Sequence, residues 1–160
     1  KRRVIAMRIK VNEELKKILS DDSTIKLLAT LTPEGEVHSA VKQSIFADED
    51  GNLVYLEFFE KSQTNIDLVN SIWFDKTVSI TAVTSDRKSW FIKGKPIRTR
   101  VFGKEYEKFY RQAEERDPDN DLVAVYYIKP LEIYEQTYPV QQAQHKAKFP
   151  LYVHLDKYAE

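Results

Sequence analysis

The residues best suited to chemistry lie in one short stretch, residues 61–66, Lys-Ser-Gln-Thr-Asn-Ile. An apolar strand leads into this stretch, and a helix is predicted to follow it. A helix N-terminus offers unpaired N–H groups and a partial positive charge, so an adjoining lysine and hydroxyl groups could seat a phosphate. The alternative is that Ser62 or Thr64 caps the helix, with Asn65 or Asp67 completing a capping box. The residue types alone leave both interpretations open.

Other common catalytic and ligand-binding patterns are missing. The chain has four glycines, and no glycine-rich nucleotide loop can be built from them. Its three histidines are scattered, and no metal-ligand spacing is present. The aspartates between 117 and 121 are better explained as a helix stop and turn than as a calcium loop. If the protein performs chemistry, we expect a cofactor to carry it.

Composition limits the class of protein. The 160 residues predict a single globular unit, and 25 basic against 25 acidic residues give no net field that would favour nucleic acid or an anionic membrane. The absence of cysteine excludes disulfides and thiolate chemistry. No apolar run approaches the ~20 residues needed to span a bilayer, and the apolar part of residues 1–6 is too short for a signal peptide. We therefore expect a cytoplasmic protein without a membrane anchor.

The first half of the chain predicts a helix and a three-stranded meander. Asn12 can cap a helix whose apolar residues recur at helical spacing. Strands are predicted over 25–31, 37–46 and 53–59, joined by turns rich in proline, glycine and acidic residues. Residues 25, 27, 29 and 31 share one apolar face, and the third strand is apolar enough to be buried on both faces. A helix over about 64–73 should then direct four apolar residues inward: Ile66, Val69, Ile72 and Trp73.

The second half predicts further strands with helices between them. Strands are expected over 77–84 and over 90–102, the latter interrupted by a bulge or bend at 94–96. An amphipathic helix over 103–116 precedes a last strand that begins at Leu122 and continues beyond Pro130. The tail after Pro139 is a polar spacer followed by an apolar patch near 149–153, which favours either an arm packed on a second subunit or a loosely ordered terminus. The predicted division is an N-terminal helical segment at 1–22, a main domain at 23–137 and a C-terminal arm at 138–160.

The order of these motifs resembles the pyridoxamine 5'-phosphate oxidase-like family of FMN-binding split barrels. The hairpin at 28–39 resembles the opening hairpin of that family, and residues 61–66 resemble its Lys-Ser/Thr-x-x-Asn-Leu phosphate motif. Residues 75–80 stand where the family usually has Asn-Pro-x-Val-Ser, and the resemblance covers roughly residues 23–136. Hairpins with inserted helices independently predict a mainly β fold, an antiparallel barrel or sheet with peripheral helices.

The resemblance implies a split antiparallel β-barrel and a homodimer with FMN at its interface. By position it assigns the phosphate to Lys61, Ser62 and Asn65. It assigns the isoalloxazine to residues of the second and third strands, and a stacking or closing role to a tryptophan of the partner subunit. These additional candidates are His38, Ser39, Val41, Lys42, Glu57, Phe58, Phe59 and Trp90. Ordinary roles in a strand, on a solvated surface or in core packing remain the alternatives for His38, Lys42 and Trp90.

The implied function is that of an FMN-dependent oxidoreductase or flavin reductase, which passes electrons or hydride between NAD(P)H and an unidentified small-molecule acceptor. The phosphate motif here has a single lysine, and the C-terminal signature of the vitamin B6 oxidases is not evident, so a general flavin-binding member is favoured over a pyridoxamine phosphate oxidase. Two alternatives stay open. One is a flavin-binding module without turnover, and the other is a relative that binds F420 or haem.

Overall fold

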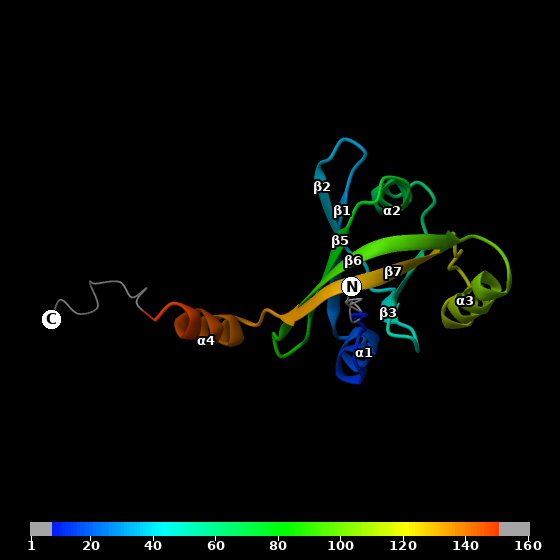
Figure 1. Cartoon of the computed structure of the whole chain (residues 1–160). Coiled ribbons are helices and arrows are strands. Elements are labelled where there is room, and N and C mark those ends of the chain that lie inside the picture. The colour runs from blue at the N-terminus through cyan, green and yellow to red at the C-terminus, as the bar shows by residue number, and fades with distance from the viewer. Residues whose placement is uncertain (1–7, 151–160) are drawn as a thin grey trace, which may run out of the picture.

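The protein is built around one antiparallel sheet that curls into a half-barrel (Figure 1). A computed structural model describes residues 8–150. Within them the seven strands are β1 (Ile25–Leu31), β2 (Val37–Val41), β3 (Ile45–Ala47), β4 (Leu53–Glu57), β5 (Val78–Val83), β6 (Ser89–Arg100) and β7 (Ala124–Glu135). Their order across the sheet is β2-β1-β5-β6-β7-β4-β3, and every neighbouring pair is antiparallel. The predicted mainly β class and split-barrel arrangement are confirmed.

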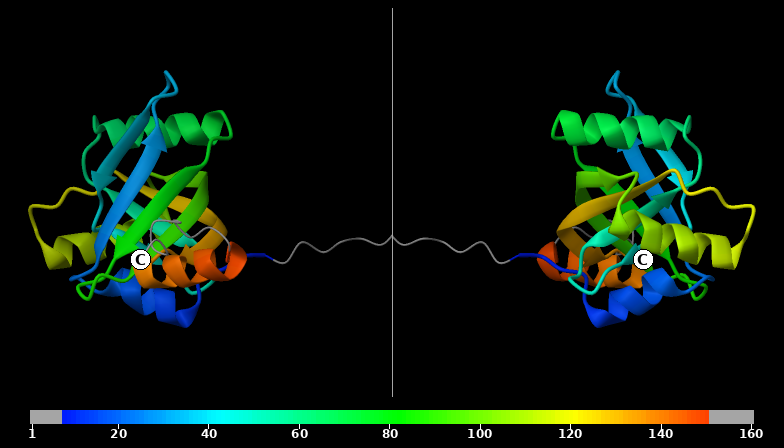
Figure 2. Two further views of the ribbon diagram at one scale, coloured as in Figure 1. Left: turned by 90° about the vertical axis from the view of Figure 1, so that its left-hand side faces the viewer. Right: turned by 90° about the vertical axis from the view of Figure 1, so that its right-hand side faces the viewer.

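The described residues include four helices: α1 (Glu13–Ser20), α2 (Gln63–Trp73), α3 (Lys104–Arg116) and α4 (Tyr138–Lys148). Figure 2 shows α1 and α2 at opposite ends of the curled sheet, with α3 beside it. Asn12 caps α1 as predicted, because its side chain accepts the N–H of Leu15 at 2.9 Å. Helix α3 also follows the prediction and packs Tyr106, Phe109 and Tyr110 against a small cluster on the outside of β4 and β7.

The meander forms as predicted, except that the strand expected over 37–46 is divided into β2 and β3. The chain turns at Gln43 and Ser44. Gln43 replaces the missing backbone pairing with its side chain, whose Oε1 accepts the N–H of Lys26 at 3.0 Å and whose Nε2 donates to the carbonyl of Thr24 at 2.9 Å. Strand β4 is almost completely buried, as predicted.

The side of β1 that faces the interior is not the apolar one. The residues buried on this strand are Lys26, Leu28 and Thr30, and the apolar set at 25, 27, 29 and 31 lies on the other, partly open face. At β1 the core covers only one face of the sheet, and both faces of the strand carry apolar residues. The alternation of apolar residues therefore did not indicate which face is buried. Polar Lys26 and Thr30 are tolerated inside because each has hydrogen-bond partners there.

The predicted inward face of α2 is wrong for three of its four residues. Ile66, Val69 and Trp73 are exposed, and Ile72 alone packs against the core. The helix instead buries Leu68 together with three polar residues, Thr64, Asp67 and Ser71. These polar groups form bonds internally, since the Asp67 carboxylate accepts from Thr30 at 2.6 Å and Ser71 donates to the Asp67 carbonyl at 2.7 Å. A satisfied polar face can therefore replace an apolar one against the sheet.

The two longest strands, β6 and β7, cross the half-barrel side by side. Their pairing register shifts between Lys93 and Gly94 and again between Pro96 and Arg98, which confirms the predicted irregularity within one continuous strand. At Gly94 a Cβ atom would lie 2.5 Å from the Cγ2 of Ile128 on the neighbouring strand. The space beside residue 94 is thus filled by the Ile128 side chain, and glycine fits there without displacing it.

The C-terminal segment is helical where a polar spacer was predicted. Helix α4 has no buried residue, and Figure 1 shows it standing away from the sheet. The apolar patch near 149–153 and the basic start at residues 1–6 lie wholly or mostly outside the described residues, as does His154. The division of the chain at residues 22 and 137 stays a prediction. None of the helices in residues 8–150 is long and apolar enough to cross a membrane.

Candidate functional site

The first turn of α2 forms the centre of the candidate site. Ser62 is the N-cap of the helix, and its Oγ accepts the N–H of Asn65 at 3.0 Å. The same hydroxyl donates to Glu57 at 2.7 Å. The capping role is thus confirmed. The cap leaves the N–H groups of Gln63 and Thr64 without a helical acceptor. Gln63 is exposed, whereas Thr64 is buried. Lys61, which precedes the cap, is exposed and directs a positive charge to the same end of the helix.

A buried carboxylate lies directly beneath this turn. The side chain of Glu57, at the end of β4, is 1% exposed and accepts four hydrogen bonds. Oε1 receives the N–H groups of Phe58 and Phe59 at 3.0 and 2.9 Å, and Oε2 receives the hydroxyls of Tyr55 and Ser62, both at 2.7 Å. The carboxylate therefore fixes the loop between β4 and α2, and its acceptor positions are occupied internally.

Two stacked tyrosines extend this network into the core. The rings of Tyr55 and Tyr126 lie 6.2 Å apart, and the Tyr126 hydroxyl donates to the Asn65 Oδ1 at 2.5 Å. The Asn65 Nδ2 donates to the Glu60 carbonyl at 2.8 Å, so this side chain is also committed inside the protein. Burial, followed by the charge of Glu57, raises the pKa of Tyr126 to about 12. Burial and the hydrogen bond to Glu57 raise the pKa of Tyr55 as well. Both phenols therefore stay protonated at neutral pH.

A second group of polar residues connects the middle of α2 to the first hairpin. The Asp67 carboxylate is fully buried and accepts from Thr30 at 2.6 Å and from the Gln63 Nε2 at 2.7 Å. His38 of β2 lies 3.4 Å from the same carboxylate through its Nδ1 and is about one-third exposed. A carboxylate at Nδ1 orients the imidazole and leaves its Nε2 for another partner.

The fold brings some of the predicted residues together and separates others. His38 and Lys42 lie on the side of β2 that faces α2, and the ammonium group of Lys42 is 5.7 Å from the centre of the Tyr55 ring. Ser39 and Val41 lie on the opposite, exposed side because side chains alternate along a strand.

The remaining predicted residues lie around or away from this centre. Phe59 is exposed beside the loop, whereas Phe58 packs toward α3. Trp90 packs against the core, nine positions along β6 from Thr99, the pairing partner of Tyr126. That spacing corresponds to ~30 Å. The Nε1 of Trp90 is buried and has no partner within the described residues.

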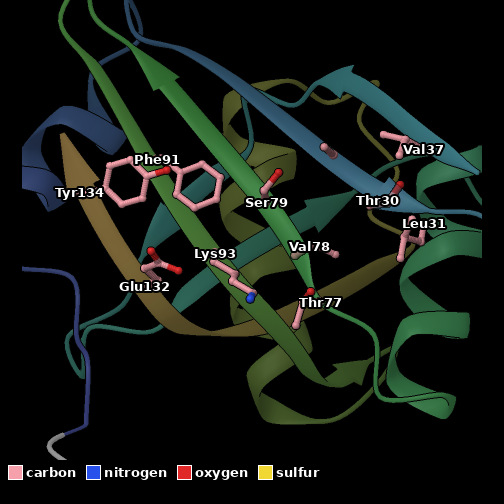
Figure 3. A pocket seen from close by; sticks show the side chains of 11 residues that line it. Thr30, Leu31, Val37, Thr77, Val78, Ser79, Phe91, Lys93, Glu132 and Tyr134 are labelled. Carbon is pink, nitrogen blue, oxygen red and sulfur yellow. The ribbon is translucent and has the colours of Figure 1, made fainter. Parts of the chain in front are cut away.

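A groove lies on the open face of the sheet, with a volume of about 410 Å³. Figure 3 shows it running across β1, β5, β6 and β7, with Phe91 and Tyr134 side by side at one end and Leu31 and Val37 at the other. The two rings are 4.9 Å apart. Between these ends the groove is lined by small side chains such as Ser79 and Thr77, and by the charged residues Lys93 and Glu132, so a flat ligand there would meet polar groups as well as the strands. Within residues 8–150 no group of three or more histidine and carboxylate residues is suited to hold a metal ion.

Sequence reasoning missed Thr30, Tyr55, Gln63 and Tyr126 as members of the site, and named Asp67 only as a possible cap. The buried aspartate had a detectable signal, since a charged residue three positions after Thr64 and four before Ser71 marks a polar helix face. The tyrosines gave none, because a tyrosine in an apolar strand is ordinary core material. The role of the two tyrosines depends on their hydrogen bonds to Glu57 and to Asn65 of α2, which a pattern of apolar residues in a strand does not reveal.

The comparisons with known proteins agree with this architecture. No protein-family model matches the chain, and no curated protein matches it either. Among solved structures, a tagged form of HupZ from Group A Streptococcus is 20% identical with a TM-score of 0.67, covering 80% of this chain and 95% of that one. An FMN-binding protein from Syntrophomonas wolfei subsp. wolfei is 14% identical with a TM-score of 0.64, covering 78% and 84%. At these identities the likeness shows the fold.

Three further structures show the range of ligands named for this fold. A putative pyridoxamine 5'-phosphate oxidase from Lactobacillus delbrueckii is 15% identical, covers 78% of this chain and 93% of that one, and has a TM-score of 0.56. An F420 reductase is 16% identical, with 78% and 98% covered and a TM-score of 0.57. HutZ, the haem storage protein from Vibrio cholerae, is 12% identical, with 79% and 95% covered and a TM-score of 0.55. The chain therefore has the split-barrel fold of pyridoxamine 5'-phosphate oxidase-like proteins.

Proposed function

We propose that the protein binds FMN and that the first turn of α2 holds the FMN phosphate. The observation that carries the proposal is the exposed helix N-terminus at Gln63, whose N–H the Ser62 cap leaves without a helical acceptor, next to the exposed cation of Lys61. The fold supports it, since an FMN-binding protein shares the same split barrel. Glu57 places a negative charge near this turn, but its four internal donors compensate that charge before a phosphate arrives.

Each residue of the turn has a separate task in this proposal. Lys61 supplies the charge that a phosphate dianion needs. Ser62 and Asn65 act by holding the loop in place, because their side chains are already bonded to Glu57, Glu60 and Tyr126. The site is thus preorganised, which limits the conformational entropy lost on binding. We assign contact with the ring system to His38 of β2 and to Lys42, which directly follows that strand.

The proposal includes a homodimer with the flavin at its interface. Helix α2 exposes Ile66, Val69 and Trp73, and its C-cap residue Phe74 is exposed as well. Trp73 is 79% exposed. An exposed apolar helix face of this kind, next to a binding turn, favours an interface in which a second subunit covers it. A Trp73→Glu variant should be monomeric in light-scattering measurements where the wild type is dimeric. An exposed control, Lys76→Glu, should remain dimeric.

When bound, FMN would supply two-electron chemistry between a reduced nicotinamide and a small acceptor, which makes the proposed activity that of a flavin-dependent oxidoreductase in the cytoplasm. The protein would bind and orient the ligand. Its buried tyrosines stay protonated and do not serve as bases near neutral pH. Purified protein should be yellow with releasable FMN, and NADH should bleach the colour. A preparation that takes up no FMN on titration would contradict the proposal.

The phosphate seat is tested by comparing FMN with riboflavin, which lacks the phosphate. Lys61→Gln should weaken FMN binding about tenfold and riboflavin binding less than twofold, because the lost charge-assisted contact involves the phosphate alone. Lys76→Gln, at the opposite end of α2, should change neither the affinity for FMN nor the affinity for riboflavin. Equal loss of both ligands in Lys61→Gln would mean that the turn is only a helix cap.

Haem is a second candidate ligand, and the His38–Asp67 pair favours it. A carboxylate at Nδ1 is the usual support for a histidine that ligates a metal through Nε2. Adding haemin to the wild type should then give a Soret band that shifts in His38→Ala, whereas His145→Ala, on the projecting α4, should leave it unchanged. An unshifted band in His38→Ala would exclude this histidine as the axial ligand.

A further inference from the structure

A second cavity lies on the other side of β4 from the α2 turn. It has a volume of about 520 Å³ and is enclosed by the end of α1, the turn between β2 and β3, the end of β4 and the face of α3. This volume falls within the range of small-molecule sites. Leu56 and Phe58 face this cavity, whereas Tyr55 and Glu57 face α2, because side chains alternate along the strand. The cavity is therefore separate from the proposed flavin site.

A buried lysine forms part of the cavity wall. Lys26 is 4% exposed, and its Nζ donates to the carbonyls of Leu19 at 2.8 Å and Ile45 at 3.0 Å. An ammonium group has three donors, so one remains without an acceptor among the described residues. None of the ion pairs formed within residues 8–150 includes Lys26. Burial lowers the pKa of this amine, as expected for a charge that has lost water without gaining a carboxylate.

The other polar groups around the cavity compensate this charge only in part: burial outweighs Asp22 and Asp21, which favour the charged amine, so its pKa remains lowered. Gln43 uses its amide on the backbone of Thr24 and Lys26, and Ser44 donates to the Leu56 carbonyl at 2.6 Å. Asp22 is exposed at the mouth, where it pairs with Arg116 at 3.2 Å. The mouth thus carries a second cation, Arg116. Its ion pair with Asp22 is largely exposed to solvent and therefore contributes little binding energy.

Much of the rest of the wall is apolar. Phe46, Leu56, Phe58 and Ala113 contribute to it, with Leu19 at the end of α1. Its remaining polar residues, Ser20, Gln112 and Asn120, carry no charge. Aromatic and aliphatic groups together with one buried cation suit a ligand with an apolar body and one negative charge.

We propose that this cavity binds a small organic monocarboxylate with an aromatic or branched apolar body, its carboxylate accepting from the Nζ of Lys26. Arg116 at the mouth attracts the anion, and the side chains of Phe46 and Phe58 contact its body. The ligand supplies the counter-ion that Lys26 lacks. The inference does not depend on FMN binding. The alternative is that Lys26 only neutralises the C-terminal end of α1 through the Leu19 carbonyl.

The test compares 3-phenylpropanoate with 3-phenylpropanamide, which has a similar shape and no charge, by titration calorimetry on the full-length protein. We expect the acid to bind at least ten times more tightly than the amide. Lys26→Met should remove this preference. Lys93→Met, in the groove on the open face of the sheet, should keep it. Equal affinities for acid and amide in the wild type, or no heat with either, would overturn the proposal.

A second variant keeps the test valid if Lys26→Met does not fold. Ala113→Leu enlarges a wall residue of α3 and leaves Lys26 intact, so it should weaken binding of the acid at least tenfold by filling the cavity. Unchanged affinity in Ala113→Leu would place the ligand elsewhere and overturn the proposal. FMN affinity, measured in parallel, should be the same in Ala113→Leu and the wild type, which separates this inference from the flavin site.

Discussion

Glu57 and Lys26 are two buried charges of opposite sign, and each lies at a helix end that favours its sign. Glu57 lies beneath the N-terminus of α2, and Lys26 lies against the C-terminal end of α1. Their partners differ. Glu57 accepts four hydrogen bonds, whereas Lys26 makes two and retains a third donor at a cavity wall.

This difference indicates different roles for two residues with similar burial. A charge whose bonding positions are all occupied by the protein stabilises the loop around it and has nothing left for a ligand. A charge with one open position is less well stabilised by the fold and can gain from a partner. We therefore expect stability to depend mainly on Glu57 and ligand affinity mainly on Lys26.

The largest effect is expected from Glu57→Leu, which leaves two hydroxyls and two N–H groups without their acceptor. The free energy of unfolding should fall by about 4 kcal/mol, measured by urea denaturation. Glu57→Gln keeps one acceptor oxygen, so its free energy of unfolding should fall by less than that of Glu57→Leu. A loss below about 1 kcal/mol in Glu57→Leu would show that the loop finds other acceptors.

Asp67→Asn gives an intermediate case. This buried carboxylate accepts from Thr30 and Gln63 and lies next to His38, so the variant replaces one acceptor oxygen with a donor group. We expect a loss of about 2 kcal/mol in the same urea assay. The exposed control Asp75→Asn should change little. A loss equal to that of Glu57→Leu would show that the number of bonds does not set the ranking.

Lys26→Met should cost only about 1.5 kcal/mol at pH 7, because the lost bonds to two carbonyls are offset by relief of the buried charge. The pKa of Lys26 is lowered in the folded state, so between this lowered value and the ordinary value of about 10.4 the unfolded chain binds more protons. The stability of the wild type relative to Lys26→Met should therefore rise as the pH is raised toward that value. A fall in the stability of the wild type relative to Lys26→Met over the same pH range would contradict this comparison.

The smallest effect is expected from Tyr126→Phe, about 1 kcal/mol at pH 7 for the lost bond to Asn65. Because the pKa of Tyr126 is raised to about 12, the folded state holds its proton between pH 10 and 12, and this contribution to stability is lost as the pH rises through that range. The variant should lose less stability there than the wild type. Absorbance at 295 nm should show one fewer late-titrating tyrosine.

Much of the fold could be predicted from the sequence because the signals are local. Turn residues at 32–36 and 48–52 fixed the hairpins, Asn12 marked a helix start, and the Gly94–Pro96 break marked the irregular strand. The error at 37–46 arose because Gln43 pairs with β1 through its side chain, which a strand pattern does not reveal.

The parts that could not be predicted depend on contacts between distant segments. The prediction of the inward face of α2 was wrong because the Asp67 carboxylate accepts a hydrogen bond from Thr30, which is 37 positions away in the chain. Lys26 in an apolar strand carries no sign of burial, since its acceptors belong to α1 and to β3. Within the candidate site the motif at 61–66 was predictable as a helix start, whereas the commitment of Ser62 and Asn65 to internal bonds was not.

The close approach of β6 and β7 at Gly94 has a consequence for how the sequence can vary. A Cβ atom at this position would lie 2.5 Å from the Ile128 Cγ2, so the Ile128 side chain or the strands must shift to accommodate any other residue. Among variants selected for folding from a fully randomised codon 94, glycine should dominate. At the neighbouring exposed Lys93 most residue types should survive. Two adjacent codons of one strand are thus expected to differ sharply in the residues they accept.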